Sequence, residues 1–399
     1  MKKILAVSLI SLLLMTVLAG CNHEETEVLN VYNWGEYISD GSEGTLDVNK
    51  AFEDYYFETY GKKVTVNYTT YASNEDMYNK LSSGAAVYDV VIPSDYMIEK
   101  MIREDMLLPL NFENIPNYQY IDEKYKNAYY DPESLYSVPY FCGYVGVIYN
   151  TAMVEGEPTD WDLLWNEKYA GQILQFNNPR DAFGTAQYAL GYDVNTTEQG
   201  QWDEALTLLK TQKPLIQSYV MDEVFNKMKN GSAAIAPYYA GDFLTMYEDN
   251  EDLAFYYPAS GTNIFVDAMC IPAVSRNQEL AEAYINFMLT EEIAIANAEY
   301  TYYASPHTLV RNSETYQANM AEVHEDVMNI LYPTEGIKAT YYENLDLETT
   351  NYMNSLWENL KVESTTGPGV YVVTAMVVLV LLALLVGLWI RKRINRRYY

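Results

Sequence analysis

The sequence predicts an α/β protein of two lobes, and three observations support this prediction. The chain has 399 residues, which is more than one hydrophobic core usually serves. Hydrophobic residues make up 49% of it, so there is ample apolar material to bury. Strand-like and helix-like segments alternate in two successive series along the chain. No tandem repeat or low-complexity tract interrupts either series.

The first series alternates three strands with three helices. In order, we expect a strand at 29–34, a helix at 46–60, a strand at 62–71, a helix from Ser73 to Leu81, a strand at 88–94 and a helix at 96–106. Gly61 is a suitable residue to end the first helix, and Ser73 is a suitable N-cap for the second. This order is typical of a parallel sheet with right-handed crossovers.

The second series begins after Tyr149. We expect helices at 179–192 and 200–210, a strand at 214–220, a helix at 220–231 that ends at Gly231, a strand at 233–239, a helix from Asp242 and a strand at 253–260. Two α/β units in one chain place a crevice between them, near the carboxyl ends of the strands.

The charge distribution excludes polyanionic partners and indicates that residues 22–366, which we call the body, are exported. The chain has 55 acidic and 25 basic side chains and a net charge of -30, so we expect no nucleic-acid partner. Residues 1–21 read as an export signal, with two lysines before an apolar stretch. That stretch ends in Leu18-Ala19-Gly20-Cys21, which resembles a bacterial lipobox, so we expect lipidation of Cys21. The alternative is a plain signal peptide with a chance cysteine.

The C-terminal end predicts a second membrane anchor. Residues 370–390 contain no charged residue, and as a helix of about 1.5 Å rise per residue they suit a bilayer core. Residues 391–399 form a basic tail, and the positive-inside rule places it in the cytoplasm. We therefore expect a protein of the cell membrane whose body lies on the extracytoplasmic side. The alternative is that residues 370–390 form a buried core helix.

The sequence offers little material for catalysis or metal binding. Its histidines, His23, His307 and His324, lie far apart, and it has no CxxC spacing, no GxSxG and no phosphate-binding glycine loop. We therefore expect no enzyme activity, no metal and no cofactor. With Cys21 lipidated, Cys142 and Cys270 remain either as a disulfide or as two buried thiols, and both alternatives stay open.

Aromatic and acidic residues collect at the ends of the predicted strands. They occur as Tyr32-Asn33-Trp34-Gly35-Glu36-Tyr37, Pro93-Ser94-Asp95-Tyr96, Tyr238-Tyr239 and Phe265-Val266-Asp267. Aromatic faces attract cations, and carboxylates form charge-assisted hydrogen bonds with ammonium groups. The crevice therefore suits an amine. Individually, any of these residues is also explained by a Tyr-rich, acidic surface.

At these residues the chain resembles the spermidine/putrescine-binding proteins of polyamine ABC importers. The likeness runs over roughly residues 29–361 and is carried by YNWGEYI, TTYASNEDMYNKL, YDVVIPSDYMIEKM, SVPYFCGYVGVIYN, ALGYDVNTT, FVDAMCIPA and YASP in this order. It implies a type II periplasmic-binding-protein fold with a ligand cleft between the lobes. The first lobe would contain residues 28–143 and 267–312, and the second 144–266 and 313–362. Hinge strands would lie around 141–149 and 266–272.

The resemblance also implies the ligand-binding residues. These are Trp34, Tyr37, Ser94, Tyr96, Asn178, Asp181, Tyr238, Phe265, Asp267, Tyr303 and Glu343. Four of them depart from the family: Asn178 stands where Asp is frequent, Tyr238 and Phe265 replace Trp, and Glu343 stands where an amide is usual. These departures keep the preference for cations but move charge along the cleft.

The function implied is capture of spermidine or putrescine between aromatic walls and carboxylates, with delivery to ABC permease subunits. Two alternatives remain at this point. One is a protein of the same fold that binds another organic amine, which the four departures favour. The other is a surface scaffold that does not take part in transport.

Overall fold

The computed structural model describes residues 26–333 and 336–362. The strands are β1 (Glu27–Trp34), β2 (Val64–Tyr71), β3 (Val90–Val91), β4 (Ser137–Asn150), β5 (Ile173–Phe176), β6 (Ile216–Val220), β7 (Ile235–Tyr239), β8 (Leu253–Tyr256), β9 (Thr262–Cys270) and β10 (Ala339–Tyr341). The α-helices are α2 (Val48–Tyr60), α3 (Asn74–Ser82), α4 (Asp95–Arg103), α5 (Pro179–Leu190), α6 (Gln199–Gln212), α7 (Glu223–Lys229), α8 (Ala240–Tyr247), α9 (Gln278–Met288), α10 (Glu291–Thr301), α11 (Thr308–Asn312), α12 (Glu314–Val323), α13 (Val327–Leu331) and α14 (Leu347–Val362). Short 3-10 helices lie at Ser42–Gly44, Phe112–Asn114, Pro116–Tyr120, Glu123–Tyr125, Trp161–Trp165 and Glu167–Tyr169.

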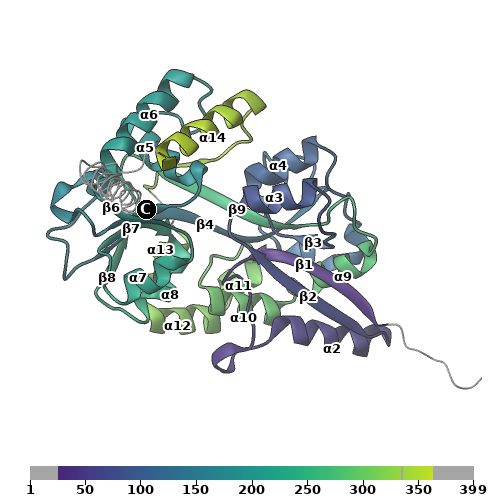
Figure 1. Cartoon of the computed structure of the whole chain (residues 1–399). Helices are drawn as coiled ribbons and strands as arrows, with labels where there is room; N and C mark the ends of the chain where they lie inside the picture. The colour runs from purple at the N-terminus through teal and green to yellow at the C-terminus, as the bar shows by residue number, and fades with distance from the viewer. Residues whose placement is uncertain (1–25, 334–335, 363–399) are drawn as a thin grey trace, which may run out of the picture.

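These elements form two α/β lobes, and β4 and β9 run between them (Figure 1). The hydrogen-bonded strand order is β2-β1-β3-β9-β4-β7-β5-β6, with β10 added on β9 and β8 added on β4. We call the part with β2, β1, β3 and the end of β9 from Asp267 the first lobe, and the part with β7, β8, β5 and β6 the second. The predicted two-lobed α/β fold is thereby confirmed.

The first lobe has the predicted alternation of strands and helices. Strand β1 pairs in parallel with both β2 and β3. The caps that the sequence indicated are present: Gly61 ends α2 with a φ of 68°, and the Ser73 side chain accepts a hydrogen bond from the Asp76 backbone at the start of α3. The cap at Gly61 fixes where α2 ends before β2, and the cap at Ser73 fixes where α3 begins at the cleft.

The second lobe contains one strand that the sequence analysis missed. Strand β5 is only four residues long and fully buried, so it lacks the alternation that identifies a half-buried strand. It pairs in parallel with β6 and with β7. Helix α8, expected from Asp242, begins two residues earlier at Ala240.

The lobes are joined where β4 changes partners. Its residues 137–144 pair antiparallel with β9, and residues 145–150 pair antiparallel with β7 and β8. Strand β10 runs parallel to the beginning of β9 at the same place. Three strands from distant parts of the sequence therefore meet between the lobes.

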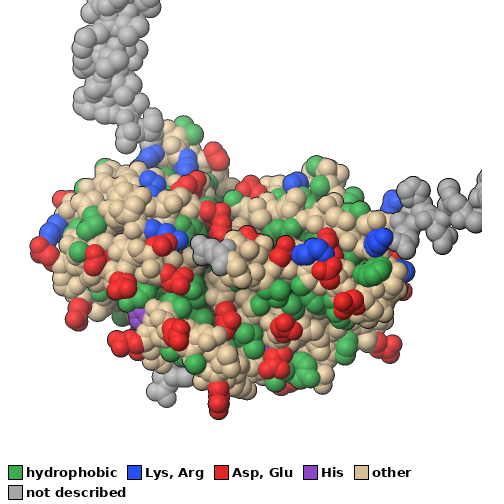
Figure 2. All heavy atoms as spheres, turned by 90° about the horizontal axis from the view of Figure 1, so that it is seen from below, with side chains coloured by type: hydrophobic (Ala, Val, Ile, Leu, Met, Phe, Trp, Pro, Cys, Tyr) green, Lys and Arg blue, Asp and Glu red, His purple; other side chains and the backbone are tan. Residues whose placement is uncertain are grey.

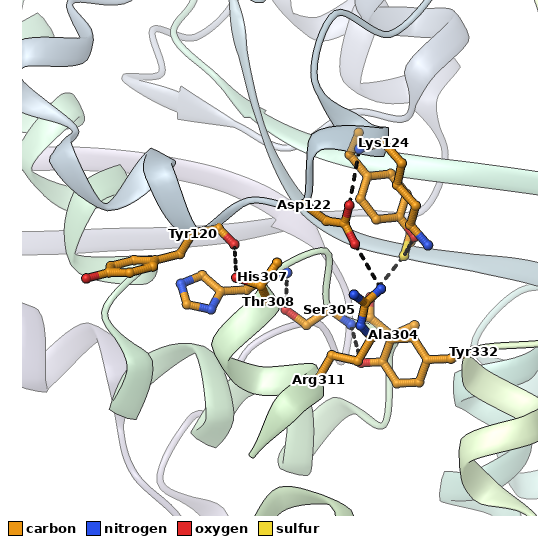
Figure 3. A network of polar contacts seen from close by, with 11 residues as sticks. Tyr120, Asp122, Lys124, Ala304, Ser305, His307, Thr308, Arg311 and Tyr332 are labelled. Atoms are coloured by element: carbon orange, nitrogen blue, oxygen red, sulfur yellow. Dashed lines mark hydrogen bonds and ion pairs between the residues drawn. The ribbon is translucent and has the colours of Figure 1, made fainter.

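The segment that follows α10 is fixed behind β4 by a polar network (Figure 3). The guanidinium of Arg311 contacts the Asp122 carboxylate at 2.8 Å, and the Thr308 hydroxyl donates to the Tyr120 carbonyl oxygen at 2.8 Å. The Ser305 backbone donates to the Tyr332 hydroxyl at 2.9 Å. These contacts hold the chain that follows Tyr303, a residue that lines the cleft.

Cys142 and Cys270 are free and buried. Both lie on the β4–β9 ladder, but Cys142 pairs with Val266 and Cys270 pairs with Ser137. Ser137, the partner of Cys270, lies five residues from Cys142 on β4, which is about 16 Å at about 3.3 Å per residue, whereas a disulfide needs Cα atoms within about 7 Å. The register therefore decides between the two alternatives in favour of two buried thiols.

The anchors predicted at residues 1–21 and 370–390, and the tail at 391–399, lie outside the described residues. Within 26–333 and 336–362, no helix is both long and apolar enough to cross a bilayer. The face shown in Figure 2 carries Asp and Glu side chains spread over both lobes, with few Lys and Arg among them. The strongly acidic composition is thus displayed on this surface.

Candidate functional site

A cleft lies between the lobes and is lined by the chain at the ends of β1, β2, β3, β5, β6 and β7, together with part of β9. It holds about 850 Å³ of empty space, including space open to solvent. Ten of the eleven predicted ligand-binding residues line it: Trp34, Tyr37, Ser94, Tyr96, Asn178, Asp181, Tyr238, Phe265, Asp267 and Tyr303. The structure therefore brings together residues from most of the length of the body.

Glu343 is the exception and requires a correction. Its side chain is exposed and does not line the cleft. Its backbone N–H donates to Asn195, and its carbonyl oxygen accepts from Arg180. The neighbouring residue, Tyr342, is buried and lines the cleft instead. A shift of one residue in a segment that joins β10 to α14 thus turns the predicted side chain away.

Asp267 is the most distinctive polar group of the cleft. It lies on β9 and is only 4% exposed. The Tyr37 hydroxyl donates to Oδ2 at 2.6 Å, whereas the buried Oδ1 has no hydrogen-bond partner among the described residues. Burial raises the pKa of Asp267 to about 6, although hydrogen bonds from Ser94 and Tyr37 oppose this. A buried carboxylate oxygen without a donor suits a cationic hydrogen-bonding ligand.

Aromatic rings surround this carboxylate. The Trp34 indole is fixed by its Nε1–H, which donates to the Ile92 carbonyl oxygen at 2.9 Å. The rings of Tyr37 and Tyr303 meet edge to face, with centroids 4.7 Å apart. Phe265 packs against Gly143, where a Cβ atom would come within 2.8 Å of the ring. Small residues thus make room for rings whose faces attract cations.

A second carboxylate, Asp181, lies in the first turn of α5. Asn178 is the N-cap of this helix: its side-chain oxygen accepts from the Asp181 backbone N–H, and its amide donates to Asp181 Oδ2 at 2.8 Å. The Tyr239 hydroxyl donates to the same oxygen at 2.7 Å. Burial raises the pKa of Asp181. Asn178 therefore positions the carboxylate and supplies no charge of its own.

A hydrogen bond between the two lobes closes another part of the cleft. The Tyr303 hydroxyl donates to Asp242 Oδ2 at 2.9 Å. Burial raises the pKa of Asp242 to about 8, and Asp222 and Glu36 raise it further against the effect of the Tyr303 hydroxyl. Asp242 therefore holds its proton more readily than an ordinary carboxyl group.

The sequence analysis did not single out five charged or polar residues that line the cleft: Glu75, Arg180, Asp222, Asp242 and Tyr342. Glu75 shares one sequence signal with Asp181, since both lie in the first turn of a helix that follows a strand. Asp242 carries the same signal in the first turn of α8, and Asp222 is the N-cap residue of α7, so among these five residues it is Arg180 and Tyr342 that no acidic helix start indicates.

The cleft is rich in carboxyl groups. Its lining includes seven carboxyl groups, namely Glu36, Glu75, Asp95, Asp181, Asp222, Asp242 and Asp267, and Arg180 is the one basic residue in the same lining. The guanidinium of Arg180 donates to the Val194 and Glu343 carbonyl oxygens and to the Asn195 side chain, and it stacks on the Tyr342 ring at 4.4 Å. The positive charge of Arg180 lowers the pKa of Glu75 and of Asp181 against the effect of burial, but it is one basic group beside seven carboxyl groups.

This geometry agrees with a known family. Residues 85–329, more than half of the chain, match the bacterial extracellular solute-binding proteins. The chain belongs to this family. These solute-binding proteins are transport components and not enzymes, and their extracellular placement agrees with the export that the sequence predicts.

Several solute-binding proteins of this family are similar to the chain over most of its length. A structure described as a spermidine/putrescine ABC transporter from Listeria monocytogenes is 31% identical with a TM-score of 0.75, and the match covers 84% of this chain and 99% of that one. The substrate-binding protein of a spermidine/putrescine ABC transporter from Streptococcus pneumoniae is 33% identical with a TM-score of 0.65 and the same coverage. The spermidine/putrescine-binding periplasmic protein of Escherichia coli K12 is 29% identical over 82% of this chain and 89% of its own length.

Proposed function

We propose that this protein is the substrate-binding component of a polyamine ABC importer. It captures spermidine or putrescine outside the cell and delivers it to the permease subunits. The observation that carries the proposal is Asp267, whose buried Oδ1 lacks a donor among the described residues in a cleft with seven carboxyl groups. An ammonium group supplies that donor, and the aromatic walls cover the rest of the ligand. The similarity to polyamine-binding relatives supports the same ligand class.

Ligand capture in this proposal includes closure of the lobes. We assign residues 28–143 and 267–312 to the first lobe and 144–266 and 313–362 to the second, with hinges around 141–149 and 266–272. The partner change of β4 after Tyr144 supports this assignment. Closure excludes water and strengthens the contacts between ammonium and carboxylate groups, and the closed form docks on the permease.

The protein is held at the membrane in this proposal by a lipid on Cys21 and by a transmembrane helix at 370–390, with 391–399 in the cytoplasm. The lipobox-like sequence and the uncharged stretch support this. A similar structure from Treponema pallidum, 26% identical, is named as a lipoprotein. External protease added to intact cells is expected to release the body, and a body that stays protected would contradict the topology.

Calorimetry on the full chain in detergent tests the proposed ligand. We expect binding heat with putrescine and spermidine and none with glutamate, a solute with the opposite predominant charge. Binding of another organic amine with no heat from either polyamine would replace the proposed ligand. No heat with any amine would overturn the proposal and leave a scaffold role.

A further inference from the structure

We infer that Tyr303 and the first turn of α8 form a latch that holds the two lobes together without a ligand. Tyr303 belongs to the first lobe and follows α10, whereas Gly241 and Asp242 lie in the first turn of α8 in the second lobe. This inference rests on the lobe closure of the proposed function. It goes beyond that function, because the latch consists of protein groups alone and gives the protein a closed state that needs no ligand.

The ring of Tyr303 packs directly on the backbone at the start of α8. A Cβ atom added at Gly241 would lie 2.8 Å from Cδ2 of this ring and 3.0 Å from its Cγ, which is closer than side-chain carbons approach one another. The ring is also held by its own lobe, since Tyr37 and Phe141 contact it with centroids 4.7 and 6.0 Å away. The lobes therefore come this close only because residue 241 is glycine.

A hydrogen bond adds to this steric fit. The Tyr303 hydroxyl donates to Asp242 Oδ2 at 2.9 Å, and Tyr303 is only 6% exposed. Burial raises the pKa of Asp242 to about 8 against the effect of this hydrogen bond, and Asp222 and Glu36 raise it further. Asp242 is therefore mostly protonated at neutral pH, and a neutral carboxyl group costs less to enclose between the lobes than a carboxylate does. The hydrogen bond thus spans the lobes without burying a charge.

The latch lies at the border of the cleft. On the other side of this border, a groove between the lobes holds about 1620 Å³ of empty space, including space open to solvent. The groove is lined by α10 of the first lobe and by α7 and α8 of the second, and it shares three residues with the cleft lining, namely Glu36, Phe225 and Asp242. The hydrogen bond from Tyr303 to Asp242 therefore connects the lobes between two open spaces.

The latch has a consequence for how the lobes move. A ligand shifts an equilibrium between open and closed lobes that exists before it binds. Because both partners of the latch belong to the protein, part of the ligand-free chain is closed already. One neutral hydrogen bond changes the ratio of closed to open chains about fivefold, and the packing of Tyr303 on Gly241 adds to this. Loss of the latch should therefore open the ligand-free chain.

The test measures the distance between the lobes in the full chain in detergent. Nitroxide labels on Glu58→Cys in α2 and Glu204→Cys in α6, both exposed positions, report on the first and the second lobe by pulsed electron spin resonance. Cys142 and Cys270 are buried, so we expect them to stay unlabelled. The chain loaded with putrescine gives the distance of the closed form, and we expect part of the ligand-free parent to show the same distance.

Two variants remove the two parts of the latch. Tyr303→Phe removes only the hydroxyl and should lower the ratio of closed to open chains about fivefold without ligand. Gly241→Ala places a Cβ against the Tyr303 ring and should lower the ratio by at least about tenfold.

Each variant has a matched control. Tyr300→Phe removes a hydroxyl on α10 that donates to Asp40, within the same lobe. Gly200→Ala adds a Cβ in α6 that meets no atom of the described residues within 4 Å. Both controls should keep the ratio of the parent within about twofold, because neither touches a contact between the lobes.

The outcomes separate this inference from the proposed function. A ligand-free parent with the same distances as Tyr303→Phe overturns the latch, whether or not the parent binds an amine. A Gly241→Ala variant that keeps the ratio of the parent overturns it as well. A parent that binds no amine but differs from Tyr303→Phe contradicts only the proposed function. Should Gly241→Ala not fold, Asp242→Ala removes the acceptor and is expected to lower the ratio about fivefold.

Discussion

The two carboxylate groups of the cleft differ in which lobe builds them. Asp267 and its partners Tyr37 and Ser94 all belong to the first lobe. Asp181 is positioned by Asn178 and Tyr239 of the second lobe, and it faces Glu75 of the first. The hydrogen-bond partners of Asp267 thus come from one lobe, whereas Glu75 and Asp181 come from different lobes.

This difference suggests that the two groups of carboxylates bind different ammonium groups of the ligand. We expect a preorganised site to bind the first ammonium group before the lobes close. A site that is completed by closure adds binding free energy only for a ligand that is long enough to reach it. Changes at Asp267 should therefore affect every amine, and changes at the pair should affect only polyamines.

Asp267→Asn should weaken all amines. The substitution keeps the shape of the side chain but removes the charge that faces the ligand, so we expect a loss of about 2 kcal/mol or more in binding free energy for putrescine and n-butylamine alike. Calorimetry measures both. Asp222→Asn makes the same charge change at an exposed position of the cleft lining and should cost far less. Equal losses in the two variants would show that the summed electrostatic field of the cleft carboxylates, and not a contact with Asp267, holds the ligand.

Asp181→Asn should weaken putrescine but spare n-butylamine. The loss for the diamine is expected to be about 1.5 kcal/mol, since one charged partner of the second ammonium is removed and Glu75 remains. The same titrations measure it. A similar loss with the monoamine would mean that Asp181 belongs to the first ammonium site, and the contrast between the two groups would not hold.

Polyamine affinity should rise with pH between 5 and 7. Burial raises the pKa of Asp267 to about 6, so the carboxyl group is mostly protonated at pH 5 and mostly ionised at pH 7. Only the ionised form pairs with an ammonium, and we expect a gain of about tenfold across this interval. Titrations with putrescine at several pH values measure it. Asp267→Asn should lose most of this dependence, and a parent affinity that does not change with pH would contradict the assignment.

The same group predicts the opposite trend for stability without ligand. The folded-state pKa of Asp267 lies above the ordinary value of 3.8, so the folded chain keeps a proton that the unfolded chain releases. Its contribution to the free energy of unfolding is therefore present at low pH and lost as the pH rises through about 6. Thermal melting of parent and Asp267→Asn at pH 5 and pH 7 checks the sign: the parent should lose more stability than the variant.

Tyr239→Phe should have the smallest effect. It removes one hydroxyl that donates to Asp181 Oδ2 while Asn178 still donates to the same oxygen. We expect a loss of about 1 kcal/mol for putrescine and no change for n-butylamine. A loss as large as that of Asp181→Asn would mean that the tyrosine itself contacts the ligand.

Much of this site could be predicted from the sequence because it lies at the ends of regular elements. Trp34 was placed by the strand predicted at 29–34, Asp267 by the family resemblance, and Ser73 and Gly61 gave helix boundaries. Strand β5 was missed because four buried residues have no periodicity. Glu343 was placed wrongly by one position because its segment has no regular pattern, and the relation of Cys142 to Cys270 depends on a register that the sequence does not encode locally.

Glu75 and Asp242 show a different limit. Each is an ordinary acidic residue near a helix start, and what distinguishes it is the other lobe: Asp181 opposite Glu75, and Tyr303 donating to Asp242. Contacts between residues that are far apart in sequence follow from how the lobes pack. In a chain with 55 acidic residues, no local pattern separates these two from the rest.

A structure determined with spermidine bound tests the central claim most directly. We predict one ammonium nitrogen within hydrogen-bond distance of Asp267 Oδ1 and another between Glu75 and Asp181, with the methylene chain between aromatic rings. A ligand that leaves Asp267 Oδ1 without a donor, or that binds outside this cleft, would contradict the account.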